Sequence, residues 1–360
     1  MKTLMYVGGY TDGQGCSLRV MEADTGTGAF RLIRDIPKTS GHTYLCINRA
    51  GTRLYAGGED LSNPAKGKNG AVIAYAIEGD RLEQIGVCPL GPFTVPCHVS
   101  LSPDEKTLVW AEYTCAFCGA TELDADGNLS RKTVSVQNIG DGPNKPRQDK
   151  AHAHCAVVSP DGRYLCVVDL GIDQVKVFDF AGRAGGLREC EDRTIRTEPG
   201  LGPRHFIFHP NGHLAFLVYE LGNAVSSFRY DGDKFTLLQT VSMLPGQFTG
   251  DTKAAAIKIS EDGKRLFASN RGHDSIAVYD IDTETGSLTL LTIDKLVGKF
   301  PRDFTFMPGE AFAVVGHKMS HELMSYRYDK ETGKLEPLHN AFAMHRPTCI
   351  VFPYPKSSDL

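Results

Sequence analysis

Short apolar runs recur along the chain in pairs that flank a polar turn. Six stretches share this arrangement, and their first apolar runs begin at residues 44, 98, 155, 205, 256 and 303. The later copies continue with two further apolar runs, such as 275–279 and 288–291, so each copy predicts four short strands. Between the last two strands, Gly286 and Gly333 end turns of the form Asp-x-x-Thr-Gly, where a short hairpin needs a residue that tolerates positive φ.

A seventh copy is divided between the two ends of the chain. Residues 348–353 supply only a first strand, whereas 4–10, 18–22 and 29–33 resemble a second, third and fourth strand. Four antiparallel strands every ~40–50 residues are typical of propeller blades. We therefore predict an all-β chain with a single domain over 1–360, a seven-bladed β-propeller whose N- and C-terminal strands jointly close one blade. Such closure removes exposed sheet edges. Two separate β-sandwiches are the alternative, but they would not explain the divided repeat.

Composition narrows the classes of partner. Lys and Arg total 39 against 43 Asp and Glu, a net charge of −4, which gives no basic surface for nucleic acid or an anionic membrane. No apolar run approaches the ~18 residues of a membrane span, and the N-terminal apolar run is too short for a secretory signal. We therefore expect a cytoplasmic location, and we expect the ten cysteines to be free thiols.

Titratable residues gather at one end of the predicted blades. The residue before a first strand and the residue after the second strand lie at the same end, because the two strands are antiparallel. The positions before first strands are His42, His98, His154, Arg204, Arg302 and Arg346. The positions after second strands are Glu59, Glu112, Asp169, Glu220, Asn270 with Arg271, and His317. Ion pairs between neighbouring blades are one interpretation of this set. The other is a site for hydrolysis or proton transfer on an anionic ligand, because His and carboxylates transfer protons and Arg binds oxyanions, phosphates and carboxylates.

Other chemical signals are weak. His152 and His154 could form a metal pair, but no third ligand is spaced to join them, and the lone pair Cys115 and Cys118 favours a hairpin over a zinc site. We expect neither a metal nor a cofactor. The motifs of serine hydrolases, P-loop NTPases and zincins are absent from the sequence. Four histidines fall in turns or loops, where we expect them to be solvated: His209, His213, His321 and His339.

Several stretches resemble the lactonase-type seven-bladed propellers, the family of the cycloisomerase-2 type 6-phosphogluconolactonases and the fungal carboxymuconate lactonizing enzymes. The stretches are Asn-Arg-Gly-His-Asp-Ser-Ile-Ala-Val at 270–278, Gly-Pro-Arg-His-Phe at 202–206, Tyr-Glu-Leu at 219–221 and the Gly-Gly-Tyr-Thr opening at 8–11. The resemblance implies a metal-free site with catalytic residues His154, Glu220, Arg204 and Arg271. We expect the substrate-binding residues to be His152, Asp169, Asn270, His273, Arg302 and Arg346. The family more often has Asn at the position of Tyr219. It more often has an Asn-Gln pair at the position of His317, so the contact of the His317 blade with a ligand is open.

Three functions fit these residues. The first is hydrolysis of a sugar lactone, in particular 6-phosphoglucono-1,5-lactone of the pentose phosphate pathway, with His154 or Glu220 as the base. The second is a muconate-type lactonizing or other sugar-acid enzyme, since the same residue types could serve both reactions. The third is a non-enzymatic interaction scaffold, because a propeller fold does not fix function. We expect a small anionic lactone or sugar acid as the partner, no nucleic acid or membrane, and a monomer or weak homo-oligomer.

Overall fold

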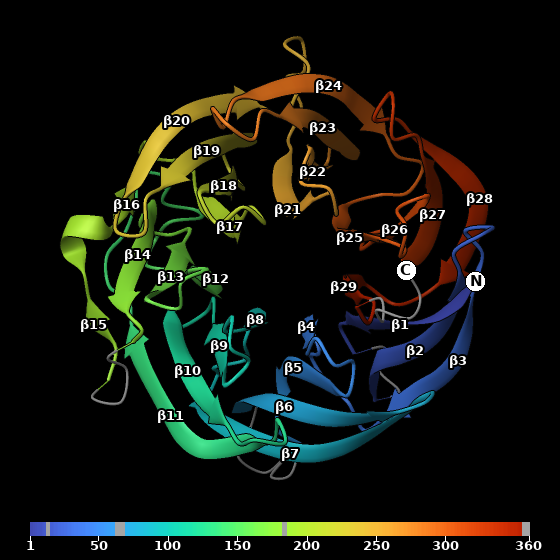
Figure 1. Ribbon diagram of the computed structural model, residues 1–360, viewed down its shortest axis with the longest axis horizontal. Helices are drawn as coiled ribbons and strands as arrows, with labels where there is room; N and C mark the ends of the chain where they lie inside the picture. The colour runs from blue at the N-terminus through green and yellow to red at the C-terminus, as the bar shows by residue number, and fades with distance from the viewer. Residues whose placement is uncertain (12–14, 62–68, 182–185, 355–360) are drawn as a thin grey trace. The chain divides into compact units, whose positions relative to one another are not determined.

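The computed structural model describes residues 1–11, 15–61, 69–181 and 186–354. In these residues 29 β-strands form seven sheets, and the helical segment η3 (Glu191–Arg193) is a single 3-10 turn (Figure 1). The contacts within the chain define two compact units. One comprises Met1–Val99, Leu123–Ser130 and Val297–Leu360, and the other comprises Ser100–Glu122 and Arg131–Leu296. The domain boundary 1–360 stays a prediction.

The first unit contains three four-stranded antiparallel sheets. One has the order β29-β1-β2-β3, with β29 (Pro347–Val351), β1 (Lys2–Gly9), β2 (Cys16–Asp24) and β3 (Phe30–Pro37). The next is β4 (Tyr44–Ile47), β5 (Arg53–Glu59), β6 (Asn69–Glu78) and β7 (Arg81–Pro92). The third is β25 (Pro301–Phe306), β26 (Phe312–His317), β27 (Glu322–Tyr328) and β28 (Leu335–Ala343).

The second unit contains three sheets and most of a fourth. The fourth is β8 (His98–Leu101), β9 (Thr107–Ala111), β10 (Phe117–Leu123) and β11 (Leu129–Gln137). The five-stranded sheet is β12 (Ala153–Val158), β13 (Tyr164–Asp169), β14 (Gln174–Asp179), β15 (Arg188–Glu189) and β16 (Ile195–Arg196). The next is β17 (Pro203–Phe208), β18 (Leu214–Tyr219), β19 (Ala224–Tyr230) and β20 (Phe235–Ser242). The last is β21 (Lys253–Ile259), β22 (Arg265–Arg271), β23 (Ser275–Ile281) and β24 (Leu288–Lys295).

The two ends of the chain share one sheet, as the divided repeat predicts. Strand β29 pairs antiparallel with β1 through Tyr6 opposite Val351 and Gly8 opposite Cys349 (Figure 1). Gly8 is required there because a Cβ atom at this position would lie 2.2 Å from the carbonyl oxygen of His42. The all-β class, the seven blades and the blade closed by both termini are therefore confirmed.

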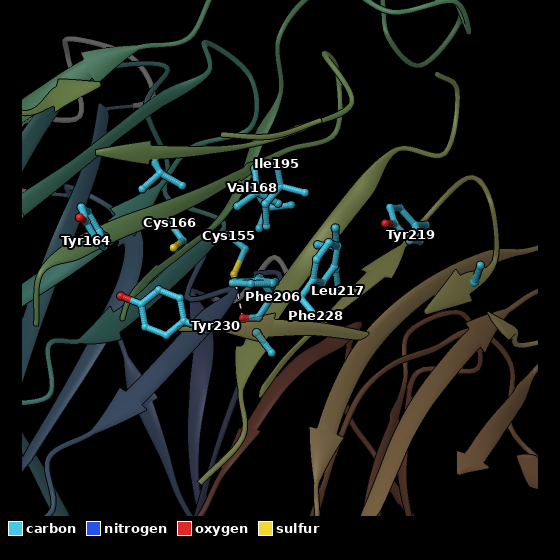
Figure 2. Packing of buried hydrophobic residues seen from close by; sticks show 14 residues of the cluster. Cys155, Tyr164, Cys166, Val168, Ile195, Phe206, Leu217, Tyr219, Phe228 and Tyr230 are labelled. Atoms are coloured by element: carbon cyan, nitrogen blue, oxygen red, sulfur yellow. Dashed lines mark hydrogen bonds between the residues drawn. The ribbon is translucent and has the colours of Figure 1, made fainter. Parts of the chain in front are cut away.

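Within each unit, apolar side chains fill the space between successive sheets. Figure 2 shows such a cluster, in which Cys155 and Cys166 of the β12–β16 sheet pack with Phe206 and Phe228 of the β17–β20 sheet. The Cys155 Sγ lies 3.9 Å from the Phe206 carbonyl oxygen. Burying one large apolar side chain contributes roughly 1.5–3 kcal/mol. Clusters of these side chains therefore contribute to holding neighbouring sheets together.

Four first strands, β12, β17, β21 and β25, start two or three residues earlier than the apolar pattern predicts, and a bulge explains the difference. In the β12–β13 pair, Ala153 lies opposite Asp169 and Cys155 opposite Val168, so the register shifts by one residue at His154. The β17–β18 pair leaves Arg204 in the same position, between Pro203 and His205. A bulge reorients the extra side chain relative to the regular alternation of the strand. The predicted site residues His154 and Arg204 are both extra residues of this kind.

All ten cysteines are free thiols, as the sequence predicts. Burial raises the pKa of the Cys155 thiol to about 12, so this thiol stays protonated at neutral pH. In the described parts of the chain, no helix has the length and apolar character that crossing a membrane requires.

Candidate active site

Glu220 is the centre of a buried ion cluster in the second unit. Its carboxylate follows β18 and accepts hydrogen bonds from Arg204 Nε at 3.0 Å and from Arg147 Nη2. Arg271 Nη2 lies 2.6 Å from the same Oε2 atom that Arg204 contacts. The side chains of Glu220, Arg204 and Arg271 are at most 5% exposed, whereas that of Arg147 is 29% exposed.

The start of β21 makes room for the two buried arginines. Its residue Ala255 is small where the corresponding strands β12 and β17 carry His154 and Arg204, and a register shift interrupts the pairing of β21 with β22 here. Arg204 Nη1 donates to the Ala255 carbonyl at 2.7 Å. Arg271 Nη2 donates to the Ala254 carbonyl at 2.6 Å. The bulged backbone therefore fixes both guanidinium groups in position beside Glu220.

The arginines determine the charge of Glu220. Burial alone would raise the pKa of Glu220, but Arg271, Arg204, His154 and Arg147 together hold it well below its usual range. The carboxylate is therefore ionised throughout the physiological range and is a weak proton acceptor. Three guanidinium groups surround one carboxylate, which leaves two positive charges in excess within this group.

His154 is the titratable group next to this cluster. The His154 ring packs edge-on against His205 at a centroid distance of 5.3 Å and against Tyr113 at 5.6 Å. A positive charge on His154 lowers the pKa of Glu220, so the two side chains interact electrostatically. The arrangement places an imidazole, a group that can accept a proton during a reaction, beside an ionised carboxylate.

The acidic residues at the equivalent positions of two neighbouring blades have different partners. Glu112 accepts hydrogen bonds from the backbone amides of Thr114 and Cys115. Asp169 Oδ1 accepts from the backbone amides of His152 at 2.7 Å and Gly171 at 2.9 Å. Burial raises the pKa of both carboxyl groups. These two carboxylates accept hydrogen bonds from backbone amides, whereas the Glu220 carboxylate faces arginines.

The remaining predicted residues of the second unit are buried near their own loops. His152 stacks on Tyr113 at 4.3 Å, and its Nε2 lies 3.1 Å from Asp149 Oδ1. Asn270 donates to the Met243 carbonyl at 2.9 Å. The His273 ring lies 2.7 Å from the Ser275 hydroxyl.

Two predicted substrate-binding residues belong to the first unit. Arg302 is half-buried in β25. Arg346 is exposed immediately before β29 and has a φ of 43°. Their role in binding a substrate stays a prediction.

Sequence reasoning missed Arg147 and Tyr113 and was wrong about His209. Arg147 and Tyr113 lie outside the repeated strands, in connecting segments whose polar composition gives no periodic signal. The one feature that could have indicated these two residues is their position in connections between strands, because such connections often carry functional residues. His209, which we expected to be solvated, is 5% exposed because its Nε2 bonds the Gly263 carbonyl at 2.8 Å.

No three His, Cys, Asp or Glu side chains gather as a metal site within residues 1–11, 15–61, 69–181 and 186–354.

Known proteins resemble this chain over nearly its whole length. The family model described as "Lactonase, 7-bladed beta-propeller" matches residues 4–352. The 6-phosphogluconolactonase of Bacillus subtilis is 33% identical over 356 residues, with 98% of each chain covered. The periplasmic gluconolactonase of Pseudomonas aeruginosa is 29% identical with a TM-score of 0.90, and the match covers 98% of this chain and 99% of that structure. A putative 6-phosphogluconolactonase from Bacteroides fragilis is 28% identical with a TM-score of 0.85, with 98% of each chain covered.

Proposed function

Because the chain belongs to the lactonase family of seven-bladed β-propellers, we propose that it hydrolyses 6-phosphoglucono-1,5-lactone to 6-phosphogluconate. Membership confirms the resemblance that the sequence motifs indicate, and it implies a small lactone as the substrate. The choice of a phosphorylated sugar lactone is supported by the activity named for the Bacillus subtilis relative and by the excess of positive charge around Glu220.

The single observation that carries the proposal is the arrangement of His154 beside an ionised, arginine-bound Glu220. In the proposed reaction, His154 accepts a proton from water as the water oxygen bonds to the lactone carbonyl carbon. The imidazolium is stabilised by the Glu220 carboxylate, and the guanidinium groups of Arg204 and Arg271 stabilise the developing oxyanion. Collapse of the intermediate breaks the ring C–O bond, and the imidazolium returns its proton to the ring oxygen. The product is the open-chain hydroxy acid.

In this proposal His154, rather than Glu220, is the base. Glu220 is a poor proton acceptor because three arginines stabilise its ionised form. Arg204 and Arg271 donate hydrogen bonds to backbone carbonyls in addition to their contacts with Glu220. Their proposed role is therefore to position the carboxylate and to supply positive charge, with His154 as the group that moves the proton.

The proposed setting is the pentose phosphate pathway of the cytoplasm. Ten free thiols suit a reducing compartment, which supports this location. Fractionation of cells that express the chain would test it, and recovery outside the cytoplasm would contradict it.

A panel of lactones tests the activity. Hydrolysis of 6-phosphoglucono-1,5-lactone, glucono-1,5-lactone and a muconolactone would be followed by pH-stat above the uncatalysed rate. We expect the wild type to accelerate the phosphorylated lactone most, and we expect His154→Gln to lower kcat by about 10²–10⁴-fold. His209→Gln is the matched control, because His209 is also a buried histidine but lies at the opposite end of the β17–β18 pair. Preference for the muconolactone would favour the lactonizing alternative, and no acceleration by the folded protein would favour a scaffold.

A further inference from the structure

Arg147 differs from the two other arginines on Glu220 in its accessibility. Arg204 and Arg271 have side chains 2% and 5% exposed, and both donate to carbonyls of β21. Arg147 is 29% exposed, and its Nη2 contacts Glu220 Oε1 and, at 3.4 Å, the Tyr113 hydroxyl. Of the three guanidinium groups, Arg147 is therefore the one that solvent and a ligand reach most easily.

The segment that carries Arg147 is held firmly against the turn that follows β13. The neighbouring Gln148 is fully buried, and its Nε2 donates to the Leu170 carbonyl at 2.9 Å. Its Oε1 accepts from the Asn144 backbone amide at 3.0 Å. A Cβ atom on Gly171 would lie 1.9 Å from the Lys150 carbonyl oxygen, so the approach of this segment requires glycine. The backbone of Arg147 is thus fixed, while its long side chain retains an exposed face.

Glu220 does not depend on Arg147 for neutralisation. If Arg147 turns toward a ligand, Arg204 at 3.0 Å and Arg271 at 2.6 Å still compensate the carboxylate. The excess positive charge in the cluster would then lie partly on a group that can reach an anion. Arginine suits this task because its planar fork of donors binds two oxygens of a phosphate or carboxylate at once.

We propose that Arg147 binds the anionic substituent of the substrate, and that it exchanges its contact with Glu220 Oε1 for the phosphate of a phosphorylated lactone. This inference rests on the proposed lactonase function and extends it, because it assigns the choice between phosphorylated and neutral lactones to one residue outside the repeated strands. Arg204 and Arg271 hold Glu220 in both cases, so they affect every substrate alike.

The test compares Arg147→Gln with Lys145→Gln on two substrates. Lys145 is the matched control, because it is an exposed cation of the same segment that pairs with the exposed Asp141. We expect Arg147→Gln to lower kcat/KM for 6-phosphoglucono-1,5-lactone by about 10- to 100-fold, mainly through KM, since a charge-assisted contact is lost. For glucono-1,5-lactone the change should stay under about threefold. Lys145→Gln should leave both rates near those of the wild type.

Two kinetic outcomes would overturn the proposal. An equal loss on both lactones would show that Arg147 acts through Glu220, as a positioning residue. An equal effect of Lys145→Gln would show that only the general positive charge of the segment matters.

A binding measurement separates failure of this inference from failure of the proposed function. If the wild type hydrolyses neither lactone, the hydrolytic function is wrong, and calorimetry with 6-phosphogluconate and gluconate still tests Arg147. Tighter binding of 6-phosphogluconate by the wild type, with the difference lost in Arg147→Gln and kept in Lys145→Gln, would support the anion site. Equal binding of both acids by the wild type, or an unchanged preference in Arg147→Gln, would overturn it.

Discussion

Replacing Glu220 by Gln removes the single negative charge of the buried arginine cluster. Arg204 and Arg271, 2% and 5% exposed, would then be left as buried cations without a carboxylate partner. Removing one member of a buried ion pair costs about 3–5 kcal/mol of unfolding free energy. With an unfolding entropy of roughly 2.1 cal/mol/K per residue, cooperative unfolding of 360 residues converts this cost into a Tm lower by about 4–7 °C at pH 7.

The pH dependence gives the experiment its sharpest form. The pKa of Glu220 lies well below the usual 4.5 in the folded protein, so its ionised form stabilises the fold above pH 4.5. That stabilisation is lost as pH falls below 4.5 and through the folded pKa. The difference in Tm between wild type and Glu220→Gln should therefore shrink as the pH is lowered in this range.

Glu112→Gln is the matched control at the equivalent position of another blade. Burial raises the pKa of Glu112 above 4.5, so in the wild type its protonation stabilises the fold as pH falls toward 4.5. The Tm of the wild type minus the Tm of Glu112→Gln should therefore rise as the pH is lowered, whereas the same difference for Glu220→Gln should fall. Differential scanning fluorimetry at several pH values from 7 to 4 would measure both slopes. Equal slopes for the two variants, or a Glu220→Gln difference that is independent of pH, would refute the reasoning.

Three further substitutions test other parts of the account. Burial lowers the pKa of His42 from 6.5 to about 4. The free energy of unfolding of the wild type should therefore fall by about 3 kcal/mol as pH falls from 6.5 to 4, and denaturant melts of His42→Gln should lack that decrease. Asp169→Asn should lower the free energy of unfolding by about 1–3 kcal/mol, because the new amide would face the Asn138 amide, which now donates to the Asp169 carboxylate at 2.8 Å. An unchanged denaturation midpoint would contradict this. In Gly171→Ala, the new Cβ atom would clash with the Lys150 carbonyl oxygen and displace the segment that carries Arg147. KM for the phosphorylated lactone should therefore rise at least about threefold. Unchanged kinetics would argue against that close approach.

The blade count could be predicted because each blade repeats the same alternation of apolar residues. That alternation defined the strands and the division of one blade between the termini, since β29 and β1 are the first and second strands of one repeat. It placed the beginnings of several first strands two or three residues too late. The reason is the bulge at His154 and Arg204, where an extra residue breaks the alternation that reveals a strand.

The candidate site was predicted only in part, and for a related reason. His154, Arg204, Glu220 and Arg271 stand at equivalent ends of repeated strands, so their gathering could be expected from the repeat. The sequence does not distinguish Glu220 from Glu112, because the difference lies in whether arginines or backbone amides are the partners.

Arg147 was not predicted because its position depends on a connecting segment. Contacts of Gln148 and Gly171 fix that segment, and neither contact leaves a periodic pattern in the chain. Residues of this kind require coordinates for their identification.

The most direct test of the central claim is a coupled assay of lactone hydrolysis with Glu220 and Glu112 variants side by side. Glucose-6-phosphate dehydrogenase would generate 6-phosphogluconolactone in situ, and formation of 6-phosphogluconate would be followed above the uncatalysed rate. The account predicts a large acceleration by the wild type and by Glu112→Gln, and a loss of that acceleration in Glu220→Gln at a temperature where all three are folded. No acceleration by the folded wild type, or equal rates for the two variants, would contradict it.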